Sequence, residues 1–536
     1  MLRRSRPGAL TLVVVSFVAL AGCAGTDSGV TAQRSTTAGD VPSVTLPGTE
    51  TTVPAGAEPS TPPSSTPPST EPTPDTPDTT DPASPSTGPS TGDGIGDELY
   101  PALGNPGVDV QDYLVDIDYD RSVGVIDGSV TMQIEFTQDR EQFTLDSLGP
   151  AVSSVAIDGD DVSFVADEPE LRITPDEPIE AGDTHEVVVV FTATPDGSSS
   201  LSGLPSGWFT TPGGSYVLNE PDGTRTWLPS NDHPSDKATW TFRITVPNGV
   251  TAVANGRLVG TTPSDDVASQ TWEWREDEPM PTYLMLLVTG DYEIVESSTA
   301  DGLPLVSAVL RDELPTMQPF LDGIEAQIEF FEPLFGPYPL DRYGLAITDS
   351  FGGLAMETQG RSLFSRDDLR APGGFIEELL LSHELAHQWF GNAVSPARWG
   401  DIWLNESFAT YAQWMWLEHI GLTTVADETA FALENRQSGD GDATGSPAAD
   451  DLFGYNSYDG GAVVLHALRL TIGDDSFFEV LQRWAADNEG TSRTTEDFIE
   501  LAESVAGEQL DELFDAWLFG DPPPAGFPSV SAPALG

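Results

Sequence analysis

Cysteine and basic residues are scarce in this sequence. Cys23 is the only cysteine among 536 residues, so an intramolecular disulfide is excluded and the body of the chain offers no thiol nucleophile. There are 22 Lys and Arg against 86 Asp and Glu, which gives a formal net charge of −64 at pH 7. Because such an acidic surface repels nucleic acid and anionic membranes, we expect no nucleic-acid partner.

The first residues form an apolar run that is too short to cross a bilayer as a helix. The run covers residues 10–20 and follows three arginines, which is the layout of a secretory signal. The next residues, Leu20-Ala21-Gly22-Cys23, resemble a bacterial lipobox, in which cleavage precedes the cysteine and its thiol receives lipid. We predict a signal peptide over residues 1–22 and lipidation of Cys23.

Residues 23–97 are dominated by Pro, Thr, Ser and Gly. This composition cannot bury enough apolar surface to offset the entropy lost on ordering, and its prolines favour extended conformations. We interpret the stretch as a disordered tether that holds an exported body on the outer face of the bacterial cytoplasmic membrane or in the cell envelope. Membrane contact would then be through the lipid anchor only, and we expect a monomer.

The hydrophobic pattern changes along the rest of the chain. Over residues 98–297 apolar and polar residues alternate, which indicates half-buried β-strands, and over residues 298–526 the apolar spacing becomes helical. We therefore predict an α+β multidomain protein, with a β-rich N-terminal domain, a mainly α-helical second domain and a tail over residues 527–536. The predicted helices cover residues 321–335, 375–390, 405–420, 461–472 and 497–519.

Two histidines and a glutamate lie together in the predicted helix over residues 375–390. His383 and His387 are four residues apart, so they share one face of the helix and can bind one metal ion together. Glu384 lies beside that face, where its carboxylate can reach a water on the metal. The spacing therefore predicts a metal site with Glu384 as the general base.

A third metal ligand follows further along the chain. Glu406, with 18 residues between it and His387, places a carboxylate within an apolar run, where it would be costly without a partner. Three protein ligands and one water are typical of catalytic zinc, whereas structural zinc sites are closed, usually by thiolates. We predict one zinc ion bound by His383, His387 and Glu406, with Asn405 as a candidate to orient a ligand histidine.

The segment from His383 to Glu406 resembles the gluzincin aminopeptidases, the family of aminopeptidase N and leukotriene hydrolase. Three further stretches carry the resemblance, which covers about residues 100–525. Residues 353–358 resemble the exopeptidase motif Gly-Ala-Met-Glu-Asn, residues 219–234 resemble a segment of the family's β-rich domain, and residues 458–462 resemble the motif Tyr-x-Lys-Gly-Ala. The fold that this resemblance implies is a saddle-like antiparallel β domain followed by a thermolysin-like catalytic domain.

The resemblance also implies roles for the matching residues. Glu357 and Glu220 would bind the free α-amine of a peptide, and Tyr458 would donate a hydrogen bond to the oxyanion of the tetrahedral intermediate. The other substrate-binding positions implied are Gly353, Ala355 and Met356. The implied function is a zinc-dependent aminopeptidase that hydrolyses N-terminal residues from peptides with a free N-terminus, by attack of a zinc-activated water.

Four positions depart from the family motifs. Leu354, Thr358, Ser407 and Gly460 stand where the family has Gly, Asn, Gly and Lys, which predicts a substrate pocket of altered shape. The sequence also leaves no room for the C-terminal helical-repeat domain of many relatives, so we expect a more open site. Two alternative functions stay open: a zinc endopeptidase of thermolysin type, and a catalytically inactive surface protein that binds peptides.

Overall fold

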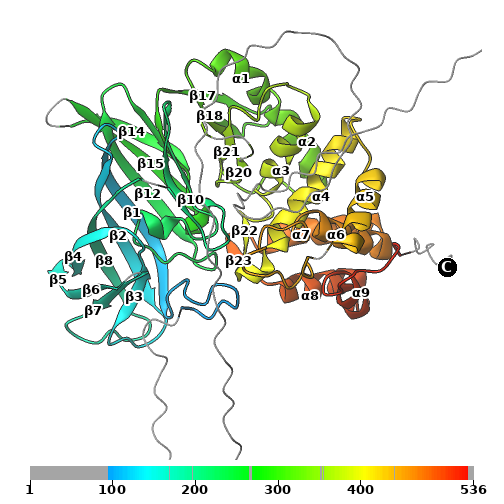
Figure 1. Ribbon diagram of the computed structural model, residues 1–536, viewed down its shortest axis with the longest axis horizontal. Helices are drawn as coiled ribbons and strands as arrows, with labels where there is room; N and C mark the ends of the chain where they lie inside the picture. The colour runs from blue at the N-terminus through cyan, green and yellow to red at the C-terminus, as the bar shows by residue number, and fades with distance from the viewer. Residues whose placement is uncertain are drawn as a thin grey trace, which may run out of the picture. The chain divides into compact units, whose positions relative to one another are not determined.

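The computed structural model (Figure 1) describes residues 94–528, except residues 168, 196, 265–267, 351–352, 354 and 440. The predicted signal peptide, Cys23, most of the tether, Leu354 and residues 529–536 lie outside these residues. The described residues belong to one compact unit, in which a β-rich region precedes a mainly helical one. This order confirms the predicted fold class.

The folded part begins before the predicted end of the tether at residue 97. Asp97 is buried, and its Oδ1 accepts hydrogen bonds from the backbone N–H groups of Leu99 and Tyr100. Its Oδ2 accepts from His233 Nε2 and from the backbone N–H of Trp399. The tether prediction is therefore wrong for Asp97, because this one carboxylate is held by four donors despite the Gly-rich sequence around it.

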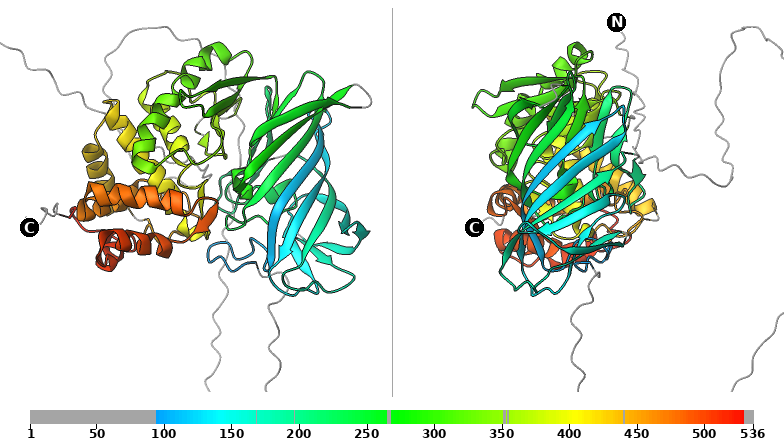
Figure 2. Two further views of the ribbon diagram at one scale, coloured as in Figure 1. Left: turned by 180° about the vertical axis from the view of Figure 1, so that it is seen from behind. Right: turned by 90° about the vertical axis from the view of Figure 1, so that its left-hand side faces the viewer.

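An eight-stranded sheet is the largest part of the β-rich domain, and Figure 2 shows its long strands side by side in blue to green. Neighbouring strands are antiparallel except β1 and β12. Along β12 every second side chain is buried, so one face packs on the core. The spatial order is β14 (Arg257–Pro263), β15 (Ser269–Met280), β12 (Ala238–Pro247), β1 (Val108–Asp120), β2 (Val125–Phe136), β8 (Thr184–Ala193), β4 (Ala151–Ile157) and β5 (Asp160–Asp161).

Two smaller sheets complete this domain. The five-stranded sheet has the order β13 (Thr251–Ala254), β16 (Leu287–Gly290), β11 (Gly214–Leu218), β10 (Pro205–Thr210) and β9 (Ser198–Ser199). The three-stranded sheet has the order β3 (Phe143–Asp146), β7 (Glu170–Thr174) and β6 (Ser163–Asp167). All five residues of β11 are buried, so this strand fixes the start of the loop that carries Glu220.

A further five-stranded sheet opens the second domain. Its order is β17 (Tyr292–Ser298), β18 (Pro304–Leu310), β19 (Leu345–Thr348), β21 (Ser362–Ser365) and β20 (Ala355–Met356). The predicted domain boundary at residues 297/298 falls inside β17, which pairs with β18 and so belongs to this sheet. Glu357 directly follows β20, so this sheet positions the glutamate of the predicted exopeptidase motif. Two short strands, β22 (Val394–Pro396) and β23 (Thr491–Arg493), pair in parallel elsewhere in the domain.

The described residues contain nine α-helices, and most predicted helices correspond to one of them. The predicted helix over 497–519 is two helices, because Gly507 adopts the left-handed conformation (φ +71°) that ends α8. The pattern also missed α1, α5 and α7. The bounds are α1 (Leu314–Leu321), α2 (Ile324–Phe335), α3 (Phe375–Ala386), α4 (Trp403–His419), α5 (Val425–Ser438), α6 (Asp459–Ile472), α7 (Asp474–Asp487), α8 (Thr495–Ala506) and α9 (Asp511–Trp517).

Helix α4 is the central helix of the catalytic domain. All of its residues from 403 to 417 are buried, and it packs against both α3 and α6. A helix that is buried all round belongs in a core. Glu406, the predicted third zinc ligand, therefore comes from a part of the molecule that neighbouring helices hold in place.

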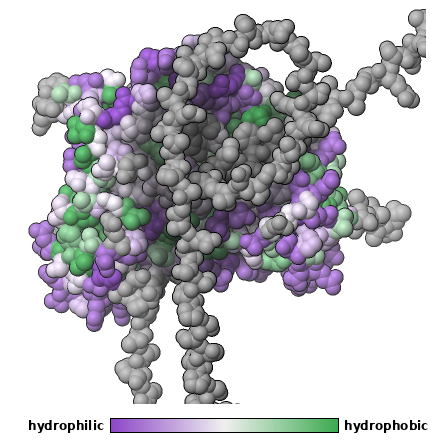
Figure 3. Space-filling model, viewed as in Figure 1, coloured by the Kyte–Doolittle hydropathy of each residue, from purple (hydrophilic) through white to green (hydrophobic). Residues whose placement is uncertain are grey.

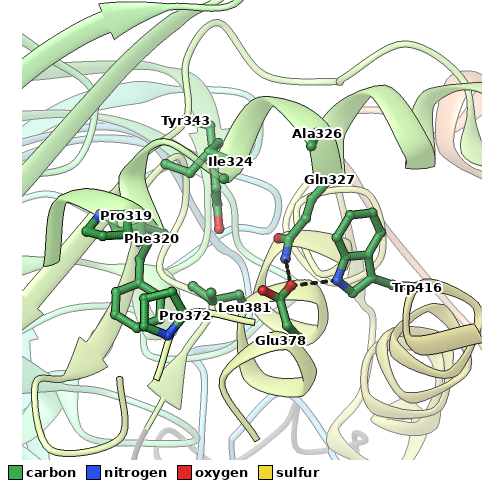
Figure 4. Close-up of a pocket in the computed structure, with 12 residues that line it drawn as sticks. Pro319, Phe320, Ile324, Ala326, Gln327, Tyr343, Pro372, Glu378, Leu381 and Trp416 are labelled. Carbon is green, nitrogen blue, oxygen red and sulfur yellow. Dashed lines mark hydrogen bonds between the residues drawn. The ribbon is translucent and has the colours of Figure 1, made fainter. Parts of the chain in front are cut away.

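A cavity of about 230 Å³ lies between α1, α2, α3 and α4 (Figure 4). At its edge the carboxylate of Glu378 accepts hydrogen bonds from Gln327 Nε2 (3.2 Å) and Trp416 Nε1 (2.9 Å). The described residues that line the cavity include none of the predicted site residues. Glu378 thus joins α2, α3 and α4 outside the predicted metal site.

Hydrophilic residues gather on part of the surface. On the face drawn in Figure 3, hydrophilic residues cover the edge where α8 and α9 lie in Figure 1. No helix within the described part of the chain combines the length and apolar character that a membrane span requires.

Candidate active site

The three predicted zinc ligands converge. His383 and His387, at the end of α3, place their Nε2 atoms 3.3 and 3.5 Å from Oε2 of Glu406 on α4. Zinc bonds of about 2.1 Å in a tetrahedral arrangement separate ligand atoms by roughly 3.4 Å. The spacing of these atoms therefore fits one zinc ion.

Both histidines are held in the tautomer that a metal needs. Nδ1 of His383 lies 2.9 Å from Oε1 of Gln413, and Nδ1 of His387 lies 3.0 Å from the backbone carbonyl oxygen of Phe390. Because each Nδ1 donates its proton to an oxygen, each Nε2 presents its lone pair to the metal position. The site is thus arranged for a cation by the protein itself.

Asn405 does not have the role expected for it. Its Nδ2 donates to the hydroxyl of Tyr283 (3.2 Å), which in turn donates to the backbone carbonyl of Gly391 (3.1 Å). Asn405 therefore ties the ligand helix α4 to the β-rich domain and to the loop after α3. The partners of the ligand histidines are Gln413 and a backbone carbonyl instead.

Glu384 lies beside the metal ligands, as the helix spacing predicts. It is buried, and one of its carboxylate oxygens lies within 4.8 Å of ligand atoms of His387 and Glu357. Burial raises the pKa of the Glu384 carboxyl well above its ordinary value, opposed by the charge of His387 and reinforced by Glu357 and Glu406. A carboxylate with raised proton affinity suits a general base.

Glu406 behaves differently from Glu384. Burial alone would raise its pKa, but the charge of His387 and the close contacts of its carboxylate with His383 and His387 lower the pKa to about 2. Glu406 is therefore an anion at neutral pH, as a zinc ligand must be.

The backbone of Glu357 is clamped by two side chains that follow the zinc motif. Its carbonyl oxygen accepts from Asn392 Nδ2 (2.6 Å) and from Gln388 Nε2 (3.2 Å). In contrast, its side-chain Oε1 is sealed from solvent, has no hydrogen-bond donor among the described residues, and lies 4.0 Å from His387 Nδ1. The position of Glu357 is fixed while its carboxylate is left unsatisfied.

Glu220 brings a second unsatisfied carboxylate from the β-rich domain. A carboxylate oxygen of Glu220 lies within 4.8 Å of those of Glu357 and Glu406. Its Oε1 is also sealed from solvent and has no donor in the described part of the chain. Burial raises its pKa well above the ordinary value, and the charges of Glu357, Glu406 and Glu384 add to this. Two such carboxylates form a binding site for a small cation.

Tyr458 stands at the start of α6. Its ring lies nearly parallel to that of His383, with centroids 5.9 Å apart. Burial and then the nearby charge of Glu406 raise the pKa of Tyr458 well above its ordinary value, so its hydroxyl keeps the proton and can donate.

One departure from the family motifs, Ser407, supports the turn that carries Tyr458. Ser407 Oγ donates to the backbone carbonyl of Ser457 (2.7 Å), and Arg436 Nη1 donates to the backbone carbonyl of Gly460 (3.0 Å). A Cβ on Gly461 would lie 1.7 Å from Ser407 Oγ, so Ser407 requires a glycine at position 461. These contacts link the ligand helix α4 directly to the Tyr458 turn.

The remaining predicted pocket residues lie on the segment that leads to Glu357. Ala355 and Met356 form β20, whose partner strand is β21, and Met356 is buried in the hydrophobic core. Gly353, at φ +85°, donates its backbone N–H to Asp368 (2.7 Å). Together they position Glu357 through the backbone.

Sequence reasoning missed the residues that orient the site. Gln413, Gln388 and Asn392 lack the residue type of a ligand or base, so no motif singled them out. A signal existed for Gln413, which is seven residues after Glu406 and therefore shares its face of α4.

The two domains match two family models. Residues 110–284 match the peptidase M1 N-terminal domain, and residues 320–517 match the peptidase family M1 domain. Aminopeptidase M1-C of Oryza sativa subsp. japonica is 28% identical over 320 residues, which are 55% of this chain and 35% of that protein. A probable aminopeptidase 2 of Sulfurisphaera tokodaii is 25% identical over 445 residues, which are 79% of this chain and 55% of that protein. The chain thus spans between about a third and about half of the length of these relatives.

Solved structures match over the whole of their own length. A mutant M1 zinc metallopeptidase from Deinococcus radiodurans, bound to the substrate Tyr-Ser-Ala, is 29% identical with a TM-score of 0.71 and is covered completely by 82% of this chain. A two-domain M1 zinc metallopeptidase mutant bound to L-tryptophan is 30% identical with a TM-score of 0.70, at the same coverage.

Proposed function

From its membership of the peptidase M1 family, to which this chain belongs, we propose that the protein is a zinc-dependent aminopeptidase. It would remove N-terminal residues from peptides with a free N-terminus. The observation that carries this proposal is the pair of unsatisfied carboxylates, Glu220 and Glu357, beside the zinc ligands. A protonated α-amine supplies the charge and the N–H donors that these carboxylates lack.

Different residues of the chain would carry out different parts of the reaction. A bound zinc ion supplies Lewis acidity, which polarises a carbonyl and makes a coordinated water more acidic. Glu384 accepts the proton of the attacking water and then delivers it to the leaving amine. Tyr458 donates a hydrogen bond to the carbonyl oxygen as negative charge develops there. Glu220 and Glu357 fix the distance from the amine to this carbonyl, so only the first peptide bond is presented.

We also propose that the protein is exported, lipid-anchored at Cys23 and monomeric. The arginines before the apolar run, the lipobox-like residues and the tether composition support the anchor. A Cys23→Ser variant is expected to leave the membrane fraction and to lose incorporation of labelled lipid. Retention of both by this variant would contradict the anchor without affecting the proposed activity.

A panel of aminoacyl reporters and peptides, with metal analysis of the same sample, tests the activity. We expect about one zinc per chain, release of free amino acids, loss of hydrolysis on chelation and recovery with Zn²⁺. Glu384→Ala is expected to reduce kcat by about 1,000-fold with zinc still bound. Equal cleavage of N-acetylated and free peptides would overturn the exopeptidase assignment in favour of an endopeptidase. Zinc binding without any hydrolysis would favour a peptide-binding protein.

A further inference from the structure

The ligand helix α4 contributes a second residue to the zinc site besides Glu406. Gln413 follows Glu406 by seven residues, which is about two helical turns, so both side chains leave the same face of α4. The Oε1 atom of Gln413 lies 2.9 Å from Nδ1 of His383, and both side chains are buried. Helix α4 therefore supplies the metal ligand Glu406 and also orients a second ligand, His383, through the contact of Gln413 with its Nδ1 atom.

The contact determines which nitrogen of His383 faces the metal position. The amide oxygen of Gln413 can only accept, so Nδ1 of His383 carries the proton and Nε2 faces Glu406 Oε2 at 3.3 Å. Without this acceptor the ring could rotate or exchange its proton, and Nε2 would present its lone pair for only part of the time. The affinity of the site for zinc would therefore fall.

The other ligand histidine is oriented differently. Nδ1 of His387 donates to the backbone carbonyl of Phe390 at 3.0 Å, a contact that no side-chain substitution at Phe390 removes. Of the two ligand histidines, His383 alone is oriented by a side chain among the described residues. Gln413 is thus the orienting contact of this site that a substitution can remove.

The acceptor is also neutral, in a site that is already strongly negative. Four glutamates, at positions 220, 357, 384 and 406, bring carboxylate oxygens to or beside the ligand set. A carboxylate at position 413 would orient His383 equally well but would add a fifth negative charge. An amide supplies the hydrogen bond without that charge.

We propose that Gln413 is a positioning residue that fixes the tautomer and ring orientation of His383 and so determines the affinity of the site for zinc. This inference rests on the metal site of the proposed function, but not on peptide hydrolysis. It is therefore tested by metal binding, so that its failure and the failure of the aminopeptidase proposal can be told apart.

The test compares zinc affinity and cobalt spectra of the full chain and three variants. Zinc Kd is measured by competition with a chromophoric chelator, and the visible spectrum is recorded after loading the protein with Co²⁺. Gln413→Leu removes the acceptor at similar size, and Gln413→Glu keeps an acceptor. Thr410→Val is the matched control, because Thr410 is buried on the same helix and its hydroxyl has no hydrogen-bond partner among the described residues.

We expect Gln413→Leu to raise the zinc Kd by about 10-fold to 100-fold and to change the Co²⁺ spectrum. We expect Gln413→Glu to keep the zinc Kd at or below that of the unaltered protein, and Thr410→Val to change it by less than about threefold. An unchanged Kd and spectrum in Gln413→Leu would overturn the proposal. If that variant does not fold by circular dichroism, Gln413→Glu decides: a Kd raised by tenfold or more would overturn it too.

Discussion

Asp97 and the pair Glu220 and Glu357 beside the zinc ligands are carboxylates with buried oxygens, but their environments are opposite. Both oxygens of Asp97 accept hydrogen bonds, two from backbone N–H groups at Oδ1 and two from His233 and Trp399 at Oδ2. One oxygen of Glu220 and one of Glu357 are sealed from solvent without any donor in the described part of the chain. The difference separates a carboxylate whose hydrogen bonds hold the fold together from two that are left available to a cation.

The pKa values follow the same division. Burial alone would raise the pKa of Asp97, but the hydrogen bonds from His233, Tyr100 and Trp399 lower it to about 2. Burial raises the pKa of Glu220 and of Glu357, and no hydrogen bond from another residue offsets it. Folding is therefore stabilised by the charge of Asp97 and opposed by the charges of the other two. A positively charged ligand would stabilise the charged forms of Glu220 and Glu357, and this gain would contribute to its binding affinity.

Among these three carboxylates, the largest effect is expected from Glu357→Gln. Removing the charge should lower kcat/KM for peptides with a free N-terminus by about 100-fold, since a charge-assisted hydrogen bond to the amine is lost. The stability of the zinc-free protein at pH 8 should stay equal or rise, because the ionised carboxylate is disfavoured in the folded state. Kinetics and thermal unfolding in the presence of a chelator measure the two effects. A marked loss of stability would show that Glu357 stabilises the fold as Asp97 does, and would contradict the distinction between them.

Asp97→Asn should give the opposite result. The buried donors lose a charged acceptor, so the free energy of unfolding should fall by about 1.5–3 kcal/mol near pH 7, while kcat/KM changes by less than twofold. A lowered folded-state pKa contributes stability that is complete above the unfolded value near 3.8 and is lost as the pH falls toward about 2. The stability difference between the two proteins should therefore shrink from pH 6 to pH 3 in urea unfolding. A difference that stays constant or grows would contradict this assignment.

The metal ligands could be predicted from the sequence because local spacing encodes them. His383 and His387 share a helix face whatever surrounds the helix, and the motif around Glu406 marks the third ligand. Asp97 could not be predicted in the same way. Asp97 lies in a Gly-rich stretch that resembles the end of the tether, and its partners His233 and Trp399 are 136 and 302 residues away along the chain.

The same limit applies to the fold. The alternation of apolar residues predicted the β-rich domain, and the helical spacing predicted α3 and α4. The break between α8 and α9 depends on a single left-handed residue, Gly507, that periodicity does not register. The role predicted for Asn405 toward a ligand histidine is wrong because neighbours along a helix point in different directions, although Asn405 adjoins the ligand Glu406. Its partner is Tyr283 from the β-rich domain.

Ser407 provides the test with the smallest expected effect, because its hydroxyl lies beside the zinc ligands but already has a hydrogen-bond partner. It follows the ligand Glu406, and its hydroxyl holds the backbone of Ser457 beside Tyr458. Ser407→Ala should lower kcat by about threefold to tenfold with KM changed by less than twofold, since one neutral hydrogen bond is worth about 1 kcal/mol. Ser382→Ala is the matched control: Ser382 adjoins the ligand His383, but its hydroxyl donates to Glu378 O within its own helix.

If Ser407 acts through Tyr458, adding Ser407→Ala to Tyr458→Phe should cost little further activity. Fully additive losses in the double variant would show that the hydroxyl supports the helix rather than the catalytic tyrosine.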